Sequence, residues 1–349
     1  MKREGSGKRK MKKIRYVQAI LLAVLMVFWG NRICLAETTG SYTDRELIIA
    51  TQIAYYGFTQ QQLENHGGSA SVRELLRETD TRKRLQDKWD SAERELDKTM
   101  AKGDIDLYEE IMAPDSRYGS WIVADICDRN QETGFYGMLL DTGNGCGLIA
   151  FRGSESTDTN QLIKDWLNAD FGLLMDRDTR QQTEAAQYLT DLQSRFGYGA
   201  YVLTGHSLGG NLAEHAAITA SDEMRLKLVQ TVNFDGPGFS KTYLERHQAE
   251  IEKTKSPLIL YRWSLVGALL THPSCTDNQV VQVTAEIQPF EKLEANYLRH
   301  STAFLEYEGE GLKRGNEDLT SAAIGVWSRT IDEEIIRKRE EYRKQQSGL

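Results

Sequence analysis

The chain has 349 residues, of which 40% are hydrophobic, and a formal net charge of −8. This length allows one large hydrophobic core or two smaller ones, and five prolines argue against a long disordered linker. Removing residues 1–36, which carry nine basic side chains and one acidic one, lowers the net charge to −16. That charge excludes general electrostatic binding of nucleic acid and docking on anionic lipid through a broad basic face.

Residues 1–36 have the three parts of a secretory signal peptide. Lysine and arginine crowd residues 1–15, an apolar run follows over residues 17–29, and Cys34 and Ala36 are small at positions −3 and −1 of a cut after Ala36. The sequence therefore predicts cleavage after Ala36 and a secreted or extracytoplasmic protein. The alternative is an uncleaved membrane anchor, but an apolar run of about 13 residues is short for a span that needs about 20.

Three cysteines follow the signal peptide, Cys127, Cys146 and Cys275. An oxidising compartment permits a disulfide, and Cys127 and Cys146 fall on neighbouring predicted strands, so these two form the candidate pair. The equally weighted alternative is three buried thiols. The spacing includes no CxxC motif and gives no zinc signal, so no metal or other cofactor is expected.

Residues 37–113 differ from the rest of the chain and are expected to form a helical N-terminal extension. Thr43 and Glu46 have the spacing of a capping box ahead of an apolar run. Residues 71–102 alternate in charge, with leucine and tryptophan at roughly helical spacing, which predicts a solvated amphipathic helix packed on the main domain. A lid or a partner-binding arm is the alternative for this segment.

Residues 114–349 form the second expected domain, in which strands and helices alternate. Alternation of this kind produces a mostly parallel sheet covered by helices on both faces, so the predicted fold class is α/β. The expected strands are residues 120–126, 135–140, 147–151, 200–204, 228–234, 258–263 and 280–284, and the expected helices are residues 178–196, 208–220, 241–255 and 318–345.

The stretch Gly205-His206-Ser207-Leu208-Gly209 fits the G-x-S-x-G pattern between a predicted strand and a predicted helix. A serine at such a junction occupies a tight, strained turn, in which the residues two before and two after it must be very small. Gly205 and Gly209 meet that demand. The helix N-terminus favours negative charge beside the serine, so Ser207 is the candidate nucleophile. We expect the side chain of His206 to point away from the reaction and to be structural.

A serine nucleophile needs a histidine base, and in this kind of site the acid and the histidine follow the serine in the chain. Four histidines do so, namely His215, His247, His272 and His300. His215 lies on the same helix, about 12 Å away by helical rise, and should be a surface or packing residue, while His247 lies in a charged helix and should be solvated. His300 follows the last predicted strands and is the preferred base, with His272 as the second candidate.

Asp235 is the candidate acid that orients the base. It ends the predicted strand in TVNFDGPGF, and the Gly-Pro-Gly that follows constrains the turn at the edge of the sheet where the serine lies. A turn aspartate that only caps its own backbone is the alternative interpretation of Asp235. Asp277, in the loop after His272, is the second candidate for the acid.

Four segments resemble the class 3 lipase group of α/β-hydrolases, and in particular its bacterial lipase-like members. These segments are LIAFRGS (residues 148–154), DW (165–166), VLTGHSLGGNLA (202–213) and NFDGPGF (233–239). The resemblance covers roughly residues 115–310 and implies the α/β-hydrolase fold. It also implies roles at matching positions: the nucleophile is Ser207, the base is His300 in RHSTAFLEY, and the oxyanion-hole donors are Ser154 and the backbone N–H of Leu208.

The chain departs from this family at one functional position. Class 3 lipases carry the acid after the strand that matches residues 258–263, where this chain has Ser264 and no carboxylate. Pancreatic-type lipases carry the acid one strand earlier, in a segment that resembles NFDGPGF, and this favours Asp235. The expected function is therefore a secreted serine hydrolase that cleaves a lipid-like acyl ester through an acyl-enzyme.

The function and the substrate each have alternatives. The protein could instead be a non-catalytic lipase-like surface or scaffold protein that binds a partner through its charged helical arm, a view supported by the missing carboxylate at Ser264. The apolar residues 171–175 and 266–270 are either walls of an acyl pocket or plain core. The expected partner is an acyl ester or lipid substrate. The sequence leaves open the acyl length, the alcohol and the choice between ester and thioester, and it also leaves open the oligomeric state of the protein. Nucleic acid is not an expected partner, whereas contact with a membrane surface is compatible with the sequence.

Overall fold

The computed structural model describes residues 41–153, 178–274, 279–286 and 299–347. Contacts divide the chain into two units, Met1–Ser41 and Tyr42–Leu349, and almost all of the first unit lies outside the described residues. The fold and the candidate site belong to the unit Tyr42–Leu349. The expectations that lie outside the described residues are those on the signal peptide, Ser154, Cys275, Asp277 and residues 171–175.

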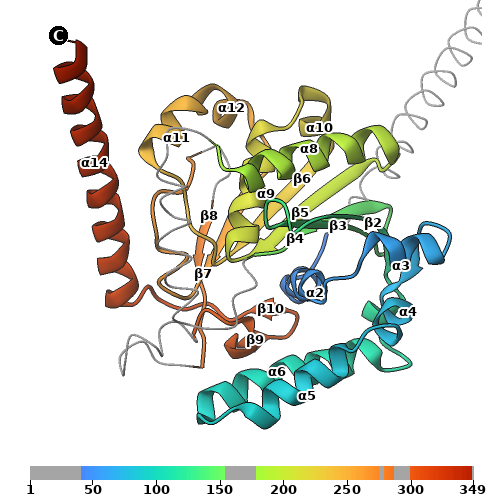
Figure 1. The fold of residues 1–349 in the computed structure, drawn as a ribbon. Helices are drawn as coiled ribbons and strands as arrows, with labels where there is room; N and C mark the ends of the chain where they lie inside the picture. Colours follow the sequence, from blue (N-terminus) through green and yellow to red (C-terminus); the bar gives the residue numbers. More distant parts are fainter. Residues whose placement is uncertain (1–40, 154–177, 275–278, 287–298, 348–349) are drawn as a thin grey trace, which may run out of the picture. The chain divides into compact units, whose positions relative to one another are not determined.

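One eight-stranded sheet, in the order β1 to β8, organises this unit (Figure 1). Strands β1 to β4 pair antiparallel and strands β4 to β8 pair parallel. Every residue of β4 and β5 is buried, as expected for strands that are covered on both faces. The strands are β1 (Ala70–Ser71), β2 (Ile122–Arg129), β3 (Phe135–Asp141), β4 (Cys146–Phe151), β5 (Ala200–His206), β6 (Leu228–Phe234), β7 (Leu258–Arg262) and β8 (Gln279–Gln282). A separate pair is formed by β9 (Tyr307–Glu308) and β10 (Gly311–Leu312).

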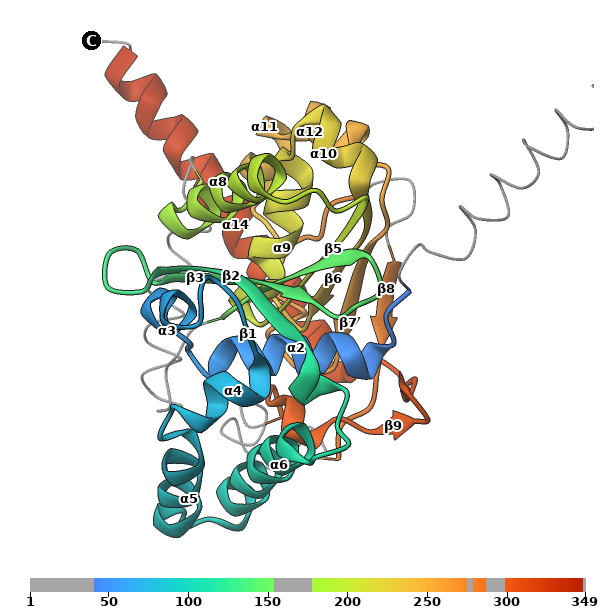
Figure 2. The same ribbon diagram turned by 90° about the vertical axis from the view of Figure 1, so that its right-hand side faces the viewer.

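Helices cover both faces of the sheet (Figures 1 and 2). Helix α2 (Asp44–Tyr55) packs against β3, β4 and β5 on one face, while α9 (Leu208–Thr219) packs against β4, β5 and β6 on the other. The helices on the α9 face are α8 (Arg180–Arg195), α10 (Asp222–Lys227), α11 (Lys241–Arg246) and α12 (Gln248–Lys253). This arrangement confirms the predicted fold class, an α/β-hydrolase fold with a mostly parallel sheet between helical layers.

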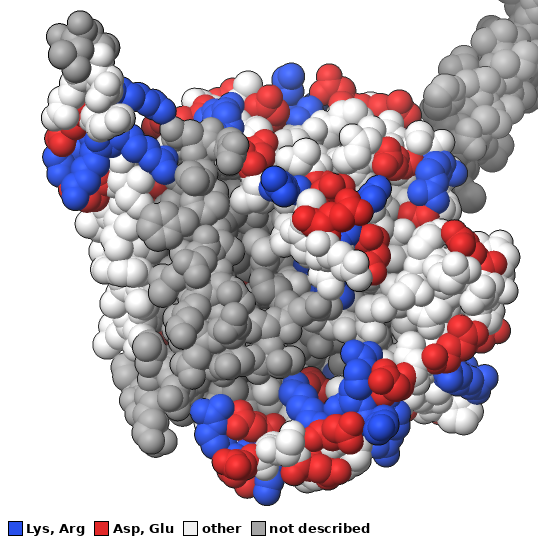
Figure 3. All heavy atoms as spheres, viewed as in Figure 1, with Lys and Arg blue, Asp and Glu red and all other residues white. Residues whose placement is uncertain are grey.

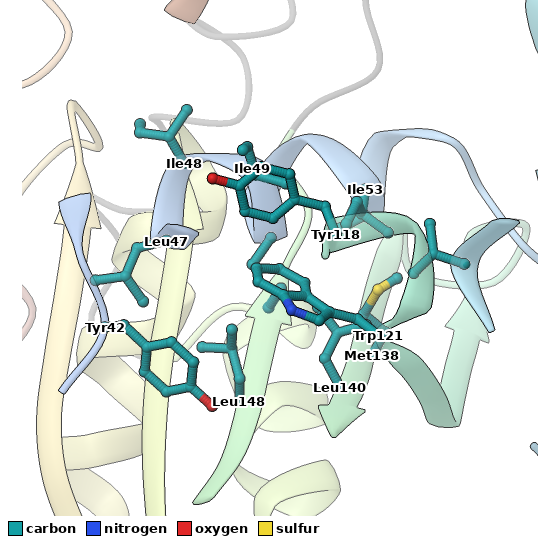
Figure 4. Close-up of a cluster of buried hydrophobic side chains, with 14 of the residues drawn as sticks. Tyr42, Leu47, Ile48, Ile49, Ile53, Tyr118, Trp121, Met138, Leu140 and Leu148 are labelled. Atoms are coloured by element: carbon teal, nitrogen blue, oxygen red, sulfur yellow. The ribbon is translucent and has the colours of Figure 1, made fainter. Parts of the chain in front are cut away.

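Helix α2 belongs to the main hydrophobic core. It starts at the predicted capping box, in which the Glu46 N–H donates to the Thr43 hydroxyl and the Thr43 N–H donates to the Glu46 carboxylate. Its apolar residues face side chains of the sheet and its flanks, and together these form one buried cluster (Figure 4) that includes Leu47, Ile49, Ile53, Trp121, Met138, Leu140 and Leu148. Each such side chain contributes roughly 1.5–3 kcal/mol on full burial, so the helix is firmly held. The domain boundary expected between residues 113 and 114 stays a prediction.

The prediction of one helix over residues 71–102 is wrong, because the segment forms three helices. They are α4 (Val72–Arg77), α5 (Thr81–Ser91) and α6 (Glu95–Met112), preceded by the short helix α3 (Gln60–Asn65). Neither break contains glycine or proline, so the charge pattern continues across both and hides them from sequence analysis. Helices α5 and α6 pack against each other, and Lys88 Nζ lies 2.7 Å from Asp104 Oδ2. Basic and acidic side chains are interspersed over these two helices (Figure 3).

The expected helix over residues 241–255 is also divided, and His247 lies at the break between α11 and α12. The side chain of His247 is buried, and its Nε2 lies 3.0 Å from Asp178 Oδ1, so the expectation that it is solvated is wrong. The break turns this histidine inward, which an uninterrupted charged helix would not do. The other expected strands and helices after residue 114 are confirmed, with shifts of a few residues at their ends.

The candidate disulfide between Cys127 and Cys146 does not form, and both thiols are free. The two strands that carry these cysteines, β2 and β4, are not neighbours, because β3 pairs with both of them. Two strand spacings separate them by about 9–10 Å, and a disulfide allows less than about 7 Å between Cα atoms. Burial raises the pKa of Cys146 to about 11, which keeps this thiol protonated and unreactive.

The C-terminal helix α14 (Leu319–Ser347) packs on the loop that follows β7. Leu265, Val266 and Leu269 form a small buried cluster with Ile324 of α14 as a neighbour, which favours plain core over an acyl-pocket wall for residues 266–270. Of the helices in the described ranges, none combines the length and the apolar character that crossing a lipid bilayer requires.

Candidate active site

Ser207 lies at the turn between β5 and α9, with a backbone φ of 58° and ψ of −136°. Residues with a side chain rarely adopt a positive φ, so this turn is strained. A Cβ on Gly205 would lie 2.2 Å from the carbonyl of Gly209, and one on Gly209 would lie 2.2 Å from the carbonyl oxygen of Phe151. Both positions therefore require glycine, which is the crowding that the sequence predicts for a nucleophile elbow.

The backbone around Ser207 connects the elbow to the neighbouring strand and to the start of α9. Its N–H donates to the carbonyl oxygen of Phe234, the last residue of β6, at 2.9 Å. Leu208 is the first residue of α9, so its N–H belongs to the positive end of the helix dipole. A Cβ on Gly153 would lie 3.0 Å from Ser207 Cβ, so the residue before Ser154 touches the elbow. The oxyanion role expected for Ser154 itself stays a prediction.

Asp235 directly follows β6 and also has a positive φ, of 55°. Its side chain is fully buried, with Oδ1 accepting from the N–H groups of Trp263 at 3.0 Å and Ser264 at 3.1 Å. Its Oδ2 accepts a hydrogen bond from the Ser264 hydroxyl. The carboxylate is therefore held from the end of the next strand, β7, at the same edge of the sheet as the elbow.

His300 is the histidine that the structure joins to this carboxylate, with 2.7 Å between His300 Nδ1 and Asp235 Oδ2. An ionised carboxylate only accepts hydrogen bonds, so Nδ1 carries the proton and Nε2 carries the lone pair. Burial alone would raise the pKa of Asp235, but hydrogen bonds from His300, Ser264 and Trp263 hold that pKa below its ordinary value. The carboxyl group is thus ionised at neutral pH.

The three candidate residues meet at one edge of the sheet. Ser207 bonds the residue before Asp235, Asp235 bonds His300, and His206, which precedes Ser207, lies with its Nε2 2.9 Å from the backbone oxygen of His300. His300 Nε2 is buried and makes no hydrogen bond with the described part of the chain, Ser207 Oγ included. Catalytic hydrogen bonds are often long without substrate and shorten when it binds. The missing bond between Ser207 and His300 is therefore compatible with a catalytic serine and histidine.

His206 does not point away from the site, and that expectation is wrong. Its ring stacks on the ring of His300, with centroids 4.5 Å apart and planes 28° apart. Its Nδ1 lies 3.3 Å from the hydroxyl of Tyr55, the last residue of α2. Burial is the main cause that lowers the pKa of His206, to about 3, and the charge of His300 adds to it. No local pattern connects residue 55 to the elbow, so sequence analysis missed Tyr55.

The second candidate base, His272, lies apart from this arrangement. Its Nδ1 is 3.3 Å from Oε2 of Glu214, a buried residue of α9. His215, expected to be a surface or a packing residue, is a packing residue: it is buried, with its Nδ1 2.6 Å from the hydroxyl of Tyr243. Neither histidine bonds Asp235, so the structure supplies His300 and no other described histidine to the carboxylate.

Ser264, the position at which the resemblance to class 3 lipases leads one to expect the acid, lies beside Asp235. Its hydroxyl bonds Asp235 and also lies 3.3 Å from His300 Nδ1. The position at which class 3 lipases carry the acid therefore lies beside the carboxylate of this chain, and both positions reach the same nitrogen. From the sequence alone Ser264 is only a missing acid, because the contact between the ends of β6 and β7 is not visible there.

The ionisable side chains of the described ranges do not gather into a metal site. None of their His, Cys, Asp and Glu groups has three or more members placed to hold an ion. What the site contains is a strained serine, a histidine with a free lone pair and a buried, ionised aspartate. This combination is able to perform nucleophilic acyl transfer.

Comparisons with known proteins give a family and a set of distant structures. A family model described as Mbeg1-like matches residues 115–342. The native Rhizomucor miehei lipase propeptide complex is 12% identical over 79% of this chain and 84% of that chain, with a TM-score of 0.35. M37 lipase is 14% identical over 83% of this chain and 91% of that chain, with a TM-score of 0.33. A Penicillium expansum triacylglycerol lipase is 13% identical over 50% of this chain and 71% of that chain, with a TM-score of 0.30. No curated protein matches the sequence.

Proposed function

Because the chain belongs to the Mbeg1-like family, and because its strained serine lies beside a histidine–aspartate pair, we propose that the protein is a serine hydrolase of carboxylic esters. The observation that carries the proposal is the bond between His300 Nδ1 and Asp235 Oδ2 next to the Ser207 elbow. We further propose a class 3 lipase-like enzyme, secreted after cleavage at Ala36, that acts on lipid-like acyl esters. The acyl substrate class is inferred from the resemblance of LIAFRGS and VLTGHSLGGNLA to that group.

In the first step, His300 Nε2 accepts the proton of the Ser207 hydroxyl as Oγ attacks the ester carbonyl. His300 then carries a positive charge, which the ionised Asp235 carboxylate stabilises across the 2.7 Å hydrogen bond. The low pKa of Asp235 is suited to this role, because the carboxylate does not compete for the proton.

The attack places a negative charge on the former carbonyl oxygen. The N–H of Leu208 at the start of α9 and a donor from Ser154 are the proposed oxyanion hole. Collapse of this intermediate expels the alcohol, which takes the proton from His300, and leaves the acyl group on Ser207. A water molecule deprotonated by His300 then hydrolyses the acyl-enzyme and restores the serine.

The alternative, a non-catalytic lipase-like scaffold, is favoured by one observation, the absence of a hydrogen bond between Ser207 and His300. In the sequence, the missing carboxylate at Ser264 also favours the scaffold. Asp235 weakens that argument, because it supplies a carboxylate to His300 from the end of the neighbouring strand, β6. The charged helices α5 and α6 would be the partner-binding arm in this alternative.

A fluorophosphonate probe applied to residues 37–349 distinguishes these two functions. We expect the wild-type protein to be labelled and Ser207→Ala to remain unlabelled, because the probe requires an activated serine. Ser221→Ala, which changes an exposed helix cap, is the matched control and should label like the wild type. A panel of p-nitrophenyl esters, followed by triglycerides and phospholipids, then identifies the acyl group and the alcohol.

Failure to label a folded wild-type protein, under conditions that label a control esterase, would remove the enzyme proposal and leave the scaffold. Labelling that persists in Ser207→Ala would place the nucleophile elsewhere. Labelling without turnover of any ester in the panel would keep the nucleophile and reject the proposed substrate class.

A further inference from the structure

We propose that Tyr55 and His206 form a positioning chain that fixes His300, so that the N-terminal helix α2 determines whether the base is aligned. This inference rests on the proposed function, because it concerns the base of that reaction. Tyr55 and His206 touch neither the scissile bond nor Asp235 in this proposal, and both act through His300.

The positioning chain begins at helix α2, which is held in the hydrophobic core. Tyr55 is the last residue of α2, whose apolar face is buried in the core together with Ile49 and Ile53. The Tyr55 hydroxyl lies 3.3 Å from His206 Nδ1 and 3.5 Å from the backbone oxygen of His206. A Cβ on Gly153 would lie 2.5 Å from the same hydroxyl. Tyr55 therefore reaches from the opposite helical layer into the space between the elbow and the loop after β4.

The contacts of His206 determine which of its nitrogens carries the proton. Its Nε2 lies 2.9 Å from the backbone oxygen of His300, which only accepts, so Nε2 must be the donor. Nδ1 is then the acceptor, and the Tyr55 hydroxyl donates to it. Tyr55 thus stabilises the tautomer of His206 that holds the backbone of His300.

His206 also holds the ring of His300. The two rings stack at 4.5 Å, and Trp263 stacks on His206 at 5.9 Å with planes 10° apart. His300 is therefore fixed at its backbone by one hydrogen bond and at its ring by stacking, while Asp235 fixes its Nδ1. Misplacement of a catalytic group by about 1 Å costs about 10²-fold in rate, so such fixing has kinetic consequences.

The charge state of His206 suits this role. Burial lowers its pKa to about 3, so the ring is neutral throughout the pH range in which His300 acts as a base. A second positive ring 4.5 Å away would oppose the imidazolium that forms on His300 during turnover. The groups that face the His206 ring are His300, Trp263 and the Tyr55 hydroxyl, with the Asp235 charge nearby.

Three substitutions separate positioning from simple space filling. Tyr55→Phe removes only the hydroxyl, His206→Phe keeps a ring without its donor, and His206→Gln keeps a donor without the ring. We expect Tyr55→Phe to lower kcat by roughly tenfold with KM unchanged, and His206→Phe to lower it further, because the His300 oxygen loses its donor. His206→Gln should recover part of the loss seen in His206→Phe. Tyr56→Phe is the matched control, since Tyr56 packs on Phe58 and Tyr108 instead.

The pH profile of kcat/KM provides the readout that a purely structural role would not change. Its acid limb reports the pKa of the free base. A misaligned His300 bonds Asp235 less well, so we expect the pH profiles of Tyr55→Phe and His206→Phe to differ from that of the wild type, and the profile of Tyr56→Phe to match it.

A measurement on the Ser207→Ala protein tests the chain without any turnover. Long-range proton–nitrogen spectra report the tautomer of each of the six histidines. We expect His206 to be neutral with its proton on Nε2 between pH 5 and 8, and the Tyr55→Phe substitution to shift the signals of both His206 and His300.

A proton on Nδ1 of His206, or His206 and His300 spectra unchanged by Tyr55→Phe, would overturn the positioning chain, whether or not the protein hydrolyses esters. An inactive wild type with the expected spectra would instead reject the proposed function and keep the chain. Equal kcat and pH profiles for wild type and Tyr55→Phe would reject the kinetic role.

Discussion

Two histidine–carboxylate pairs in the described ranges, His300–Asp235 and His272–Glu214, have side chains that are almost fully enclosed, and their surroundings differ. In the pair at the elbow, the Asp235 carboxylate accepts hydrogen bonds from two backbone N–H groups, the Ser264 hydroxyl and His300. In the second pair, Glu214 Oε2 lies 3.3 Å from His272 Nδ1, while Glu214 Oε1 and His272 Nε2 are buried and make no hydrogen bond in the described ranges.

The difference shows why one histidine is suited to catalysis. A fully bonded carboxylate stays ionised when buried and can stabilise a positive charge on its partner, whereas the second pair has one buried atom on each partner without a hydrogen bond in the described ranges. Position separates the pairs as well. Glu214 lies seven residues into α9 from Ser207, roughly 10 Å by helical rise, whereas Asp235 follows the residue that bonds the Ser207 N–H.

The largest expected effect is the loss of the charge at the elbow pair. Asp235→Asn keeps the shape but cannot select the required His300 tautomer, so we expect kcat to fall roughly 10⁴-fold. The matched change Glu214→Gln at the second pair should leave kcat close to wild type. Both are measured with a p-nitrophenyl ester at neutral pH. If Asp235→Asn retained its turnover while Asp277→Asn abolished it, Asp277 would be the acid.

A double exchange asks whether the two acid positions of the fold are interchangeable. Asp235 Oδ2 and Ser264 Oγ lie 2.7 Å and 3.3 Å from the same His300 nitrogen. We expect Asp235→Ser combined with Ser264→Asp to turn over esters within roughly 10²-fold of wild type, since a small misplacement of the carboxylate remains. Asp235→Ser alone is the control. A double variant no better than this control would mean that only the β6 position can serve.

A smaller effect is expected from the hydroxyl that anchors the acid. Ser264→Ala removes one donor to the Asp235 carboxylate and leaves the two backbone donors. Hydrogen bonds to charged groups contribute about 1.5–3 kcal/mol, so kcat should fall roughly tenfold or more and the protein should lose a similar free energy of unfolding. Ser264→Thr, which keeps the hydroxyl, should retain more activity than Ser264→Ala. The reverse order would show that size, and not the hydrogen bond, matters at this position.

The elbow shows how far sequence analysis reaches into this site. Gly205 and Gly209 are required by close backbone contacts over a few residues, and such local demands are visible in a motif. The end of each parallel strand is also marked by neighbouring residues in the sequence, and for this reason Asp235 is a candidate from its place at the end of β6. The sheet class followed from the same alternation of strands and helices.

The contacts that complete the site are not local. Tyr55 reaches His206 across 151 residues, and His300 reaches Asp235 across 65, so no spacing rule connects them. The disulfide expectation failed for a related reason, since the sequence predicted the strands of Cys127 and Cys146 but not that β3 pairs with both. Sequence periodicity also could not reveal the break at His247, because both sides of it remain helical.

The last expected effect concerns stability in acid and not turnover, and it contrasts His215 with Asp235. Burial lowers the pKa of His215 to about 4, against an opposing effect of Asp178, and His247 and Arg246 lower it further. Between pH 6.5 and 4 the unfolded chain therefore binds a proton that the folded chain does not, so the free energy of unfolding falls as the pH falls, by up to about 1.4 kcal/mol per pH unit for this one group. The pKa of Asp235 is below its ordinary value, so its contribution is lost only at more acidic pH. Urea unfolding from pH 7.5 to 4.5 should show that the free energy of unfolding depends less steeply on pH in His215→Gln than in the wild type. Equal slopes for His215→Gln and wild type would show that His215 does not contribute to this acid sensitivity.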